Sequence, residues 1–141
     1  MKLNKALKAK NKLTKKLNDH LNNFISNNSA VVGRKREFDP EVEFNNYLEV
    51  SKQLTELKTK IQIANAPILS KIYEMAEKKS LVSKLRNLPV KEGEYDNYGD
   101  KPLVYNSFIN AERKRSLVNT LEDEIEALQE EIDTFNATTS I

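Results

Sequence analysis

The chain has 141 residues, a length that favours one domain with a core of its own. Lys and Arg number 23 against 21 Asp and Glu, so the chain lacks the basic excess of a nucleic-acid-binding protein. The absence of cysteine excludes disulfides, thiolate nucleophiles and cysteine-ligated zinc. No stretch approaches the roughly 20 apolar residues of a membrane span, and the N-terminus lacks the apolar segment of a signal peptide. We therefore expect a cytoplasmic protein.

The first predicted helix covers residues 3–26, because apolar residues recur there on one helical face. That face contains Leu3, Leu7, Leu13, Leu17, Leu21 and Phe24. The rest of the segment is basic: residues 1–26 contain seven lysines, six of them in the predicted helix, against the single acid Asp19. Asn27 and Asn28 then break the pattern.

Further helices are predicted over residues 40–65, 68–88 and 107–135. Asp39 and Pro40 begin the first of these, since Asp caps helices well and Pro fits their first position. Two segments carry apolar residues at alternating spacings of three and four, as in a heptad repeat. These are Tyr47, Val50, Leu54, Leu57, Ile61 and Ala64, and then Val118, Leu121, Ile125, Leu128, Ile132 and Phe135. The last segment is acidic, with seven Asp and Glu and no base in residues 122–133.

These elements predict an all-α fold: an elongated antiparallel bundle or coiled coil of about four helices, forming a single domain over residues 1–141. Residues 89–106 are expected to form one long polar loop, with a weak signal for a short hairpin of 90–94 against 103–106. The opposite charges of the first and last helices attract, within one subunit or between subunits. Because the apolar seams are narrow and the helices long, we expect a homo-oligomer.

Several short motifs follow one another in a recognisable order. They are Met1-Lys2-Leu3 with Ala6-Leu7, the break at 27–31, Asp39-Pro40, Ile61 to Asn65, and Ile132, Asn136, Thr139 and Ile141. Over nearly its whole length the chain resembles the septicolysin-like family of small all-helical bacterial proteins, most of which are functionally uncharacterised. It departs from the family pattern in residues 93–105, which are longer and richer in tyrosine. The Lys-, Asn- and Ile-rich composition is typical of an AT-rich genome, such as that of a phage.

The region 84–115 is the strongest candidate for a binding site, because basic residues flank a tyrosine-rich segment. Arg and Lys bind phosphates, and Tyr can stack on a base. The candidate ligand-binding residues are Arg86, Tyr95, Tyr98, Lys101, Tyr105 and Arg113; the basic residues Lys84, Lys91, Lys114 and Arg115 lie close by in the sequence. The alternative is an Ω-type loop whose tyrosines pack on the helices and whose charges are solvated.

Other chemistry-bearing residues favour structural roles. As a general base, His20 would need a nucleophile and an orienting partner, and the sequence indicates neither. The acidic cluster at residues 122–133 lacks the Glu-x-x-His motif of di-iron bundles. The triplet Arg34-Lys35-Arg36 lies in a loop without flanking aromatic platforms for base stacking, which makes it a weak signal for nucleic acid as a partner. We therefore predict no enzyme activity, no cofactor and no metal.

The sequence predicts a non-catalytic, oligomeric helical protein that binds a small anionic ligand. A nucleotide signal sequestered by a phage-type sponge is the concrete form of this hypothesis, and neither a membrane nor nucleic acid is expected as a partner. The alternative is a structural coiled-coil scaffold or protein–protein adaptor, which also explains the heptads and the charge segregation.

Overall fold

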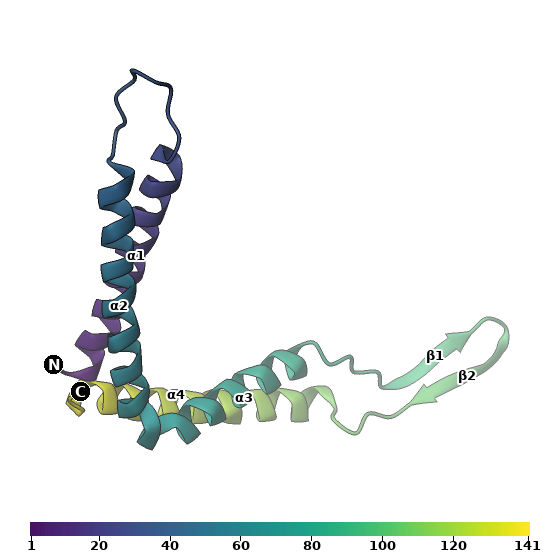
Figure 1. Ribbon diagram of the computed structural model, residues 1–141. Coiled ribbons are helices and arrows are strands. Elements are labelled where there is room, and N and C mark those ends of the chain that lie inside the picture. Colours follow the sequence, from purple (N-terminus) through teal and green to yellow (C-terminus); the bar gives the residue numbers. More distant parts are fainter. The chain divides into compact units, whose positions relative to one another are not determined.

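The computed structural model describes residues 1–141, of which 71% are helical (Figure 1). In chain order the elements are α1 (Leu3–Asn27), α2 (Pro40–Asn65), the 3-10 helix η1 (Ala66–Ile68), α3 (Leu69–Arg86), β1 (Gly93–Asn97), β2 (Asp100–Tyr105) and α4 (Ala111–Thr138). The chain divides into two compact units. One contains residues 1–67 and 133–141, and the other contains residues 68–132.

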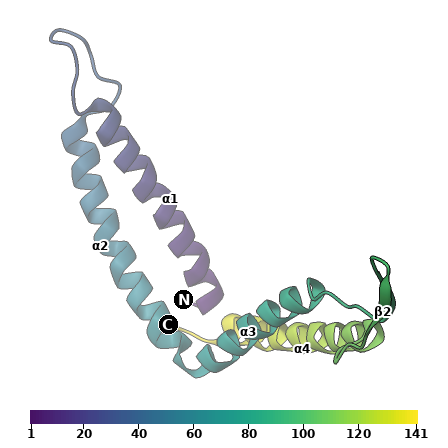
Figure 2. The same ribbon diagram turned by 90° about the vertical axis from the view of Figure 1, so that its right-hand side faces the viewer.

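In the first unit, α1 and α2 pack side by side as a helical hairpin (Figures 1 and 2). The carboxylate of Asp39 accepts a hydrogen bond from the N–H of Glu41 at 3.0 Å, and Pro40 is the first residue of α2. This cap starts the helix where the sequence predicts it. In the connection, Arg36 Nε donates to the carbonyl of Asn27 at 2.8 Å, which satisfies a carbonyl that the end of α1 leaves free.

The core of this unit lies at the end of the hairpin that holds both chain termini. Leu3 and Ala6 are completely buried against Ile61. Partly buried apolar residues surround them: Leu7, Leu57, Ala64, Phe135 and Ile141. The backbone also closes there, because the N–H of Leu3 donates to the carbonyl of Thr139 at 2.8 Å and that of Ile141 to Met1 at 3.0 Å. Leu3, Ala6, Leu7 and Ile141 of the terminal motifs therefore belong to the core or pack against it.

In the second unit, α3 and α4 run side by side in opposite directions (Figures 1 and 2). Their buried residues include Val82 and Leu85 on α3 and Leu128 on α4. Ion pairs bridge the two helices: Lys71 with Glu131, Lys78 with Glu124, and Arg86 with Glu122. The first two pairs are seven residues apart on both helices, so they repeat along the same side of the helix pair.

Residues 93–105 form a two-stranded antiparallel sheet between α3 and α4 in the chain. Asn97 pairs with Asp100, and the two residues between them both have positive φ, 49° for Tyr98 and 91° for Gly99. Positive φ at both central positions is the pattern of a type I′ hairpin turn. Ser107 closes the base of the hairpin, since its hydroxyl donates to the carbonyl of Lys91 at 2.9 Å.

The prediction of a mainly helical chain is confirmed, but the predicted all-α bundle of about four helices is wrong. Helix α1 packs closely on α2 alone, ion pairs bridge α3 and α4, and Phe135 of α4 packs against the core of the first unit. The predicted long polar loop at 89–106 is also wrong, because most of that segment forms the β-hairpin. Ser107 belongs to the hairpin base and Asn110 caps α4 by accepting from the N–H of Arg113, so α4 begins at Ala111 rather than at 107.

Candidate anion-binding site

A hollow of about 380 Å³ lies where α3 ends and α4 begins. It is lined by Arg86, Val90, Ala111, Lys114, Arg115, Val118 and Asn119. Three of these residues are cations and three are small and apolar, and none carries a carboxylate, hydroxyl, thiol or imidazole. We call this feature the basic hollow. Its size falls within the range of small-molecule sites, roughly 300–1,000 Å³.

Two of the three cations are held in place by other groups. The guanidinium of Arg86 pairs with the carboxylate of Glu122, and Lys114 Nζ donates to the carbonyl of Leu88 at 3.0 Å. Each retains further N–H donors, because a guanidinium has five and an ammonium three. Arg115 is exposed and has no ion-pair partner. The basic hollow therefore presents several unused donors and a local positive charge.

The lining residues of α4 belong to one helical face. Ala111, Lys114, Arg115 and Val118 follow the spacing i, i+3, i+4 and i+7, which places side chains on the same side of a helix. Ala111 is the first residue of α4, so the positive end of its helix dipole borders the basic hollow. This end of α4 adds to the attraction for an anion.

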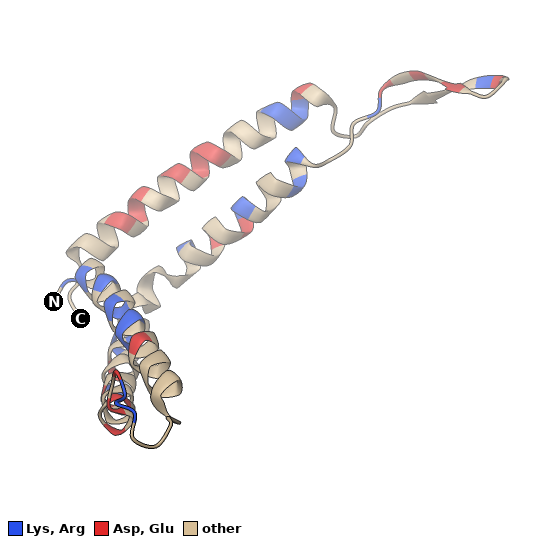
Figure 3. Ribbon diagram, turned by 90° about the horizontal axis from the view of Figure 1, so that it is seen from above, with Lys and Arg blue, Asp and Glu red and all other residues tan.

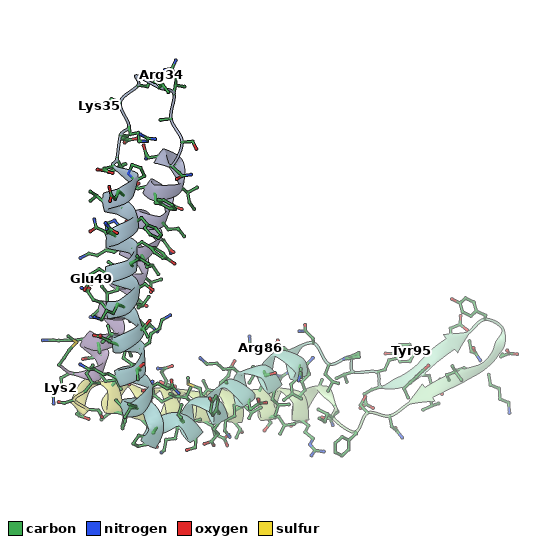
Figure 4. The ribbon with its side chains drawn as sticks, in the orientation of Figure 1. Lys2, Arg34, Lys35, Glu49, Arg86 and Tyr95 are labelled. Carbon is green, nitrogen blue, oxygen red and sulfur yellow. The ribbon has the colours of Figure 1, made fainter.

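Of the six predicted ligand-binding residues, only Arg86 lines the basic hollow. Tyr95 and Tyr105 pack edge-to-face with ring centroids 5.4 Å apart, and Lys91 Nζ lies 4.7 Å and 4.4 Å from the two centroids. Figure 4 shows Arg86 on α3 and Tyr95 on β1 in separate places. The tyrosine pair is a packing cluster on the hairpin, and Lys91 lies over both of its rings.

The other three predicted residues also lie outside the basic hollow. Tyr98 occupies the hairpin turn with its side chain fully exposed, and Lys101 is exposed on β2. The guanidinium of Arg113 lies 4.7 Å from the ring centroid of Phe108 and donates to the Phe108 carbonyl at 3.3 Å. The structure thus does not bring the six residues together.

No family profile, curated protein or solved structure matches this chain. The resemblance to the septicolysin-like family therefore stays a prediction. None of the helices combines the length and apolar character needed to cross a membrane. The chain also contains no group of three or more Asp, Glu and His side chains placed to hold a metal ion.

The remaining candidates of the sequence have local structural partners. His20 Nδ1 lies 2.5 Å from Oε2 of Glu43, between α1 and α2, and Glu43 is buried. Arg36 anchors the connection after α1, whereas Arg34 and Lys35 are exposed in it (Figure 4). The contact with His20 gives the buried carboxylate of Glu43 a polar partner, and the sequence pattern does not predict this pair.

The predicted site includes Arg113, whereas the basic hollow is lined by its neighbours Lys114 and Arg115. The helical period of α4 could have corrected this choice, because Lys114 and Arg115 share the face of Ala111 and Val118 and Arg113 does not. Val90 could not have been found in this way, since it lies in the irregular segment between α3 and β1.

Proposed function

We propose that this protein is a non-catalytic, homo-oligomeric binding protein that takes a small anionic ligand, best described as a nucleotide, into the basic hollow. The observation that carries the proposal is the presence of Arg86, Lys114 and Arg115 around one hollow of about 380 Å³. Hydrogen bonds between a cationic donor and a phosphate are about twice as strong as those between neutral groups.

The apolar part of the basic hollow suits the rest of such a ligand. Val90, Ala111 and Val118 offer surface against which a base or another ring can be desolvated. A free phosphate would use only the three cations, whereas a nucleotide would use both kinds of surface. This combination supports a phosphate-bearing ligand with a ring.

Sequestration rather than turnover is the function that these residues support. The lining residues include no hydroxyl, thiol, imidazole or carboxylate that could attack the ligand or move a proton at neutral pH. A cytoplasmic sponge of the kind that a phage uses against a nucleotide immune signal would need only tight binding. We expect the bound ligand to be recovered chemically unchanged after denaturation.

Thermal melting with a panel of cyclic and linear adenine and guanine nucleotides tests the proposal. A ligand present at 100 times its dissociation constant stabilises the folded state by about 2.7 kcal/mol. Arg115→Gln should abolish most of this stabilisation, whereas Arg113→Gln should keep it, because Arg113 lies beside Phe108 outside the basic hollow. If no nucleotide raises the melting temperature, the ligand proposal is wrong.

A specific observation also favours the second candidate, a scaffold or protein–protein adaptor. Several large apolar side chains of the helices are exposed, among them Val42, Leu48, Ile63 and Tyr73. Such residues support self-association or docking of another protein. Light scattering at micromolar concentration measures the assembly, and a mass equal to the 16.2 kDa of one chain would exclude a homo-oligomer.

A further inference from the structure

One exposed face of α1 carries lysines with no acidic partner in the chain. Lys5, Lys8 and Lys12 follow the spacing of three and four residues that aligns side chains on one face. We call these three residues the lysine stripe. All three are exposed, none forms an ion pair, and Figure 3 shows the basic residues along this helix. The stripe faces away from Leu3 and Ala6, which are buried in the core.

The lysine stripe is unfavourable for an isolated α1. Lys8 and Lys12 are like charges four residues apart, and such pairs destabilise a helix. Lys5 lies in the first turn, which contains no acid and where the helix dipole favours negative charge. Anions supplied from outside the chain would relieve both effects.

Helix α4 carries a matching set of acids. Glu122, Glu124 and Glu131 are used in the ion pairs with α3. Asp123, Glu126 and Glu130 are exposed and have no ion-pair partner in the chain; we call them the acidic stripe. They are three and four residues apart and lie on the side of α4 away from the buried Leu128 and Ile132. Figure 3 shows the acidic residues along α4.

We propose that the lysine stripe of one copy packs along the acidic stripe of a second copy. Both stripes have the same three–four spacing and span seven residues, about 10 Å along a helix axis, so the charges stay in register. In a twofold dimer each copy would supply one stripe to each of two identical contacts. The inference rests on the assembly part of the proposed function and names the surfaces that mediate it.

A second copy fits both stripes better than a nucleic acid does. Phosphates would neutralise the lysine stripe but would leave the acidic stripe unpaired. The formal net charge of the chain is only +2, so a copy of this chain approaches another without strong overall repulsion. Charge complementarity of this kind mainly sets the partner, the orientation and the association rate.

Charge reversal tests the pairing. One triple variant is Lys5→Glu, Lys8→Glu and Lys12→Glu; the other is Asp123→Lys, Glu126→Lys and Glu130→Lys. The matched control for the lysine stripe is Lys52→Glu, Lys58→Glu and Lys60→Glu, which makes the same change in net charge on exposed residues of α2. Circular dichroism confirms that each variant keeps its helix content. Sedimentation velocity at about 0.05 M and about 0.5 M salt then measures self-association with strong and with weak electrostatics.

We expect each reversal of a stripe to weaken self-association about 10-fold or more at low salt, and the control to keep the wild-type constant. An equimolar mixture of the two stripe variants should form mixed dimers, because one then carries two acidic and the other two basic stripes. Wild-type association should weaken at the higher salt. If the wild type is oligomeric and both stripe variants associate as strongly as it does, this inference is wrong, whereas the assembly proposal still holds.

A monomeric wild type overturns both the assembly and its surfaces, whereas nucleotide binding is measured separately by melting. A monomeric wild type that binds a short DNA duplex through Lys5, Lys8 and Lys12 would assign the lysine stripe to nucleic acid and would equally overturn the inference. Restoration of mixed dimers by the two variants is the decisive supporting result, since no other arrangement requires both reversals together.

Discussion

The guanidinium of Arg86 pairs with the carboxylate of Glu122 while it also lines the basic hollow. The same cation thus joins α3 to α4 and is available to a bound anion. Glu122 competes with that anion for the guanidinium. Glu122→Gln should therefore raise the affinity for a phosphate-bearing nucleotide, and Arg86→Ala should lower it. A charge-assisted contact contributes about 1.5–3 kcal/mol, so the loss should be roughly 10- to 150-fold.

Isothermal titration of the nucleotide selected by melting measures these affinities. Glu124→Gln is the matched control, because Glu124 pairs with Lys78 and not with a residue of the basic hollow. If Glu122→Gln and Glu124→Gln raise the nucleotide affinity equally, the loss of a negative charge acts at long range and not through Arg86. A higher affinity of Arg86→Ala would contradict a role of Arg86 in binding.

Burial rather than residue type should decide stability in α2. Ile61 is 5% exposed in the terminal core, whereas Ile63 is 71% exposed two residues later. Ile61→Ala should lower the free energy of unfolding by about 2–5 kcal/mol, because it removes buried methyl groups and leaves a cavity. Ile63→Ala should change it by less than about 0.5 kcal/mol. Urea unfolding followed by circular dichroism measures both, and equal losses would contradict the placement of the core.

The helices could be predicted from the sequence because their signals are local. Apolar periodicity located all the long helices, and Asp39 with Pro40 fixed the start of α2. Pro67 marked the interruption that the structure shows as η1. The start of α4 differed by a few residues from the prediction: Ser107 is held by Lys91, 16 residues away, which a local pattern does not reveal, and the cap is Asn110, which accepts from the N–H of Arg113.

The pairing of the helices and the make-up of the site could not be predicted in this way. A heptad shows that a helix has one apolar seam, but not which helix covers it, and so it cannot distinguish a bundle from separate hairpins. Tyrosines were expected to line a site because Tyr can stack on a base. In the structure the ring of Tyr95 is already occupied by Tyr105 and Lys91. Such three-dimensional neighbours decide whether a residue type is used for packing or for binding.

The ion pair between Lys78 and Glu124 predicts a dependence of stability on alkaline pH. The hydrogen bond that Lys78 Nζ donates to the carboxylate of Glu124 raises the pKa of Lys78 above its ordinary value. A lysine with a raised pKa in the folded state stabilises it at every pH below the ordinary value of about 10.4, and this contribution is lost as the pH rises through the raised value. Lys78→Met should therefore lower stability at neutral pH, and the difference from the wild type should shrink above about pH 10.4.

Urea midpoints measured from neutral pH to the alkaline limit check this dependence. Lys79→Met serves as the control, because Lys79 is exposed and has no ion-pair partner. Its effect on stability should be small. A stability difference for Lys78→Met that stays constant across the alkaline range would mean that the lysine acts through its aliphatic chain rather than its charge.

Substitutions of the hairpin tyrosines Tyr98 and Tyr105 should affect the melting temperature differently, because the two residues have different roles in the hairpin. Tyr98 has a φ of 49° in the turn, a conformation that Asn adopts more readily than Tyr. Tyr98→Asn should therefore leave the melting temperature unchanged or slightly higher, whereas the β-branched Tyr98→Val should lower it. Tyr105→Ala should lower the melting temperature through loss of the ring contact with Tyr95, worth about 0.5–1.5 kcal/mol beyond its buried area.

None of these three substitutions of Tyr98 and Tyr105 should change the nucleotide affinity measured by titration, because neither tyrosine lines the basic hollow. A loss of affinity with Tyr98→Asn at unchanged stability would instead place the ligand on the hairpin turn, and the basic hollow would then not be the binding site.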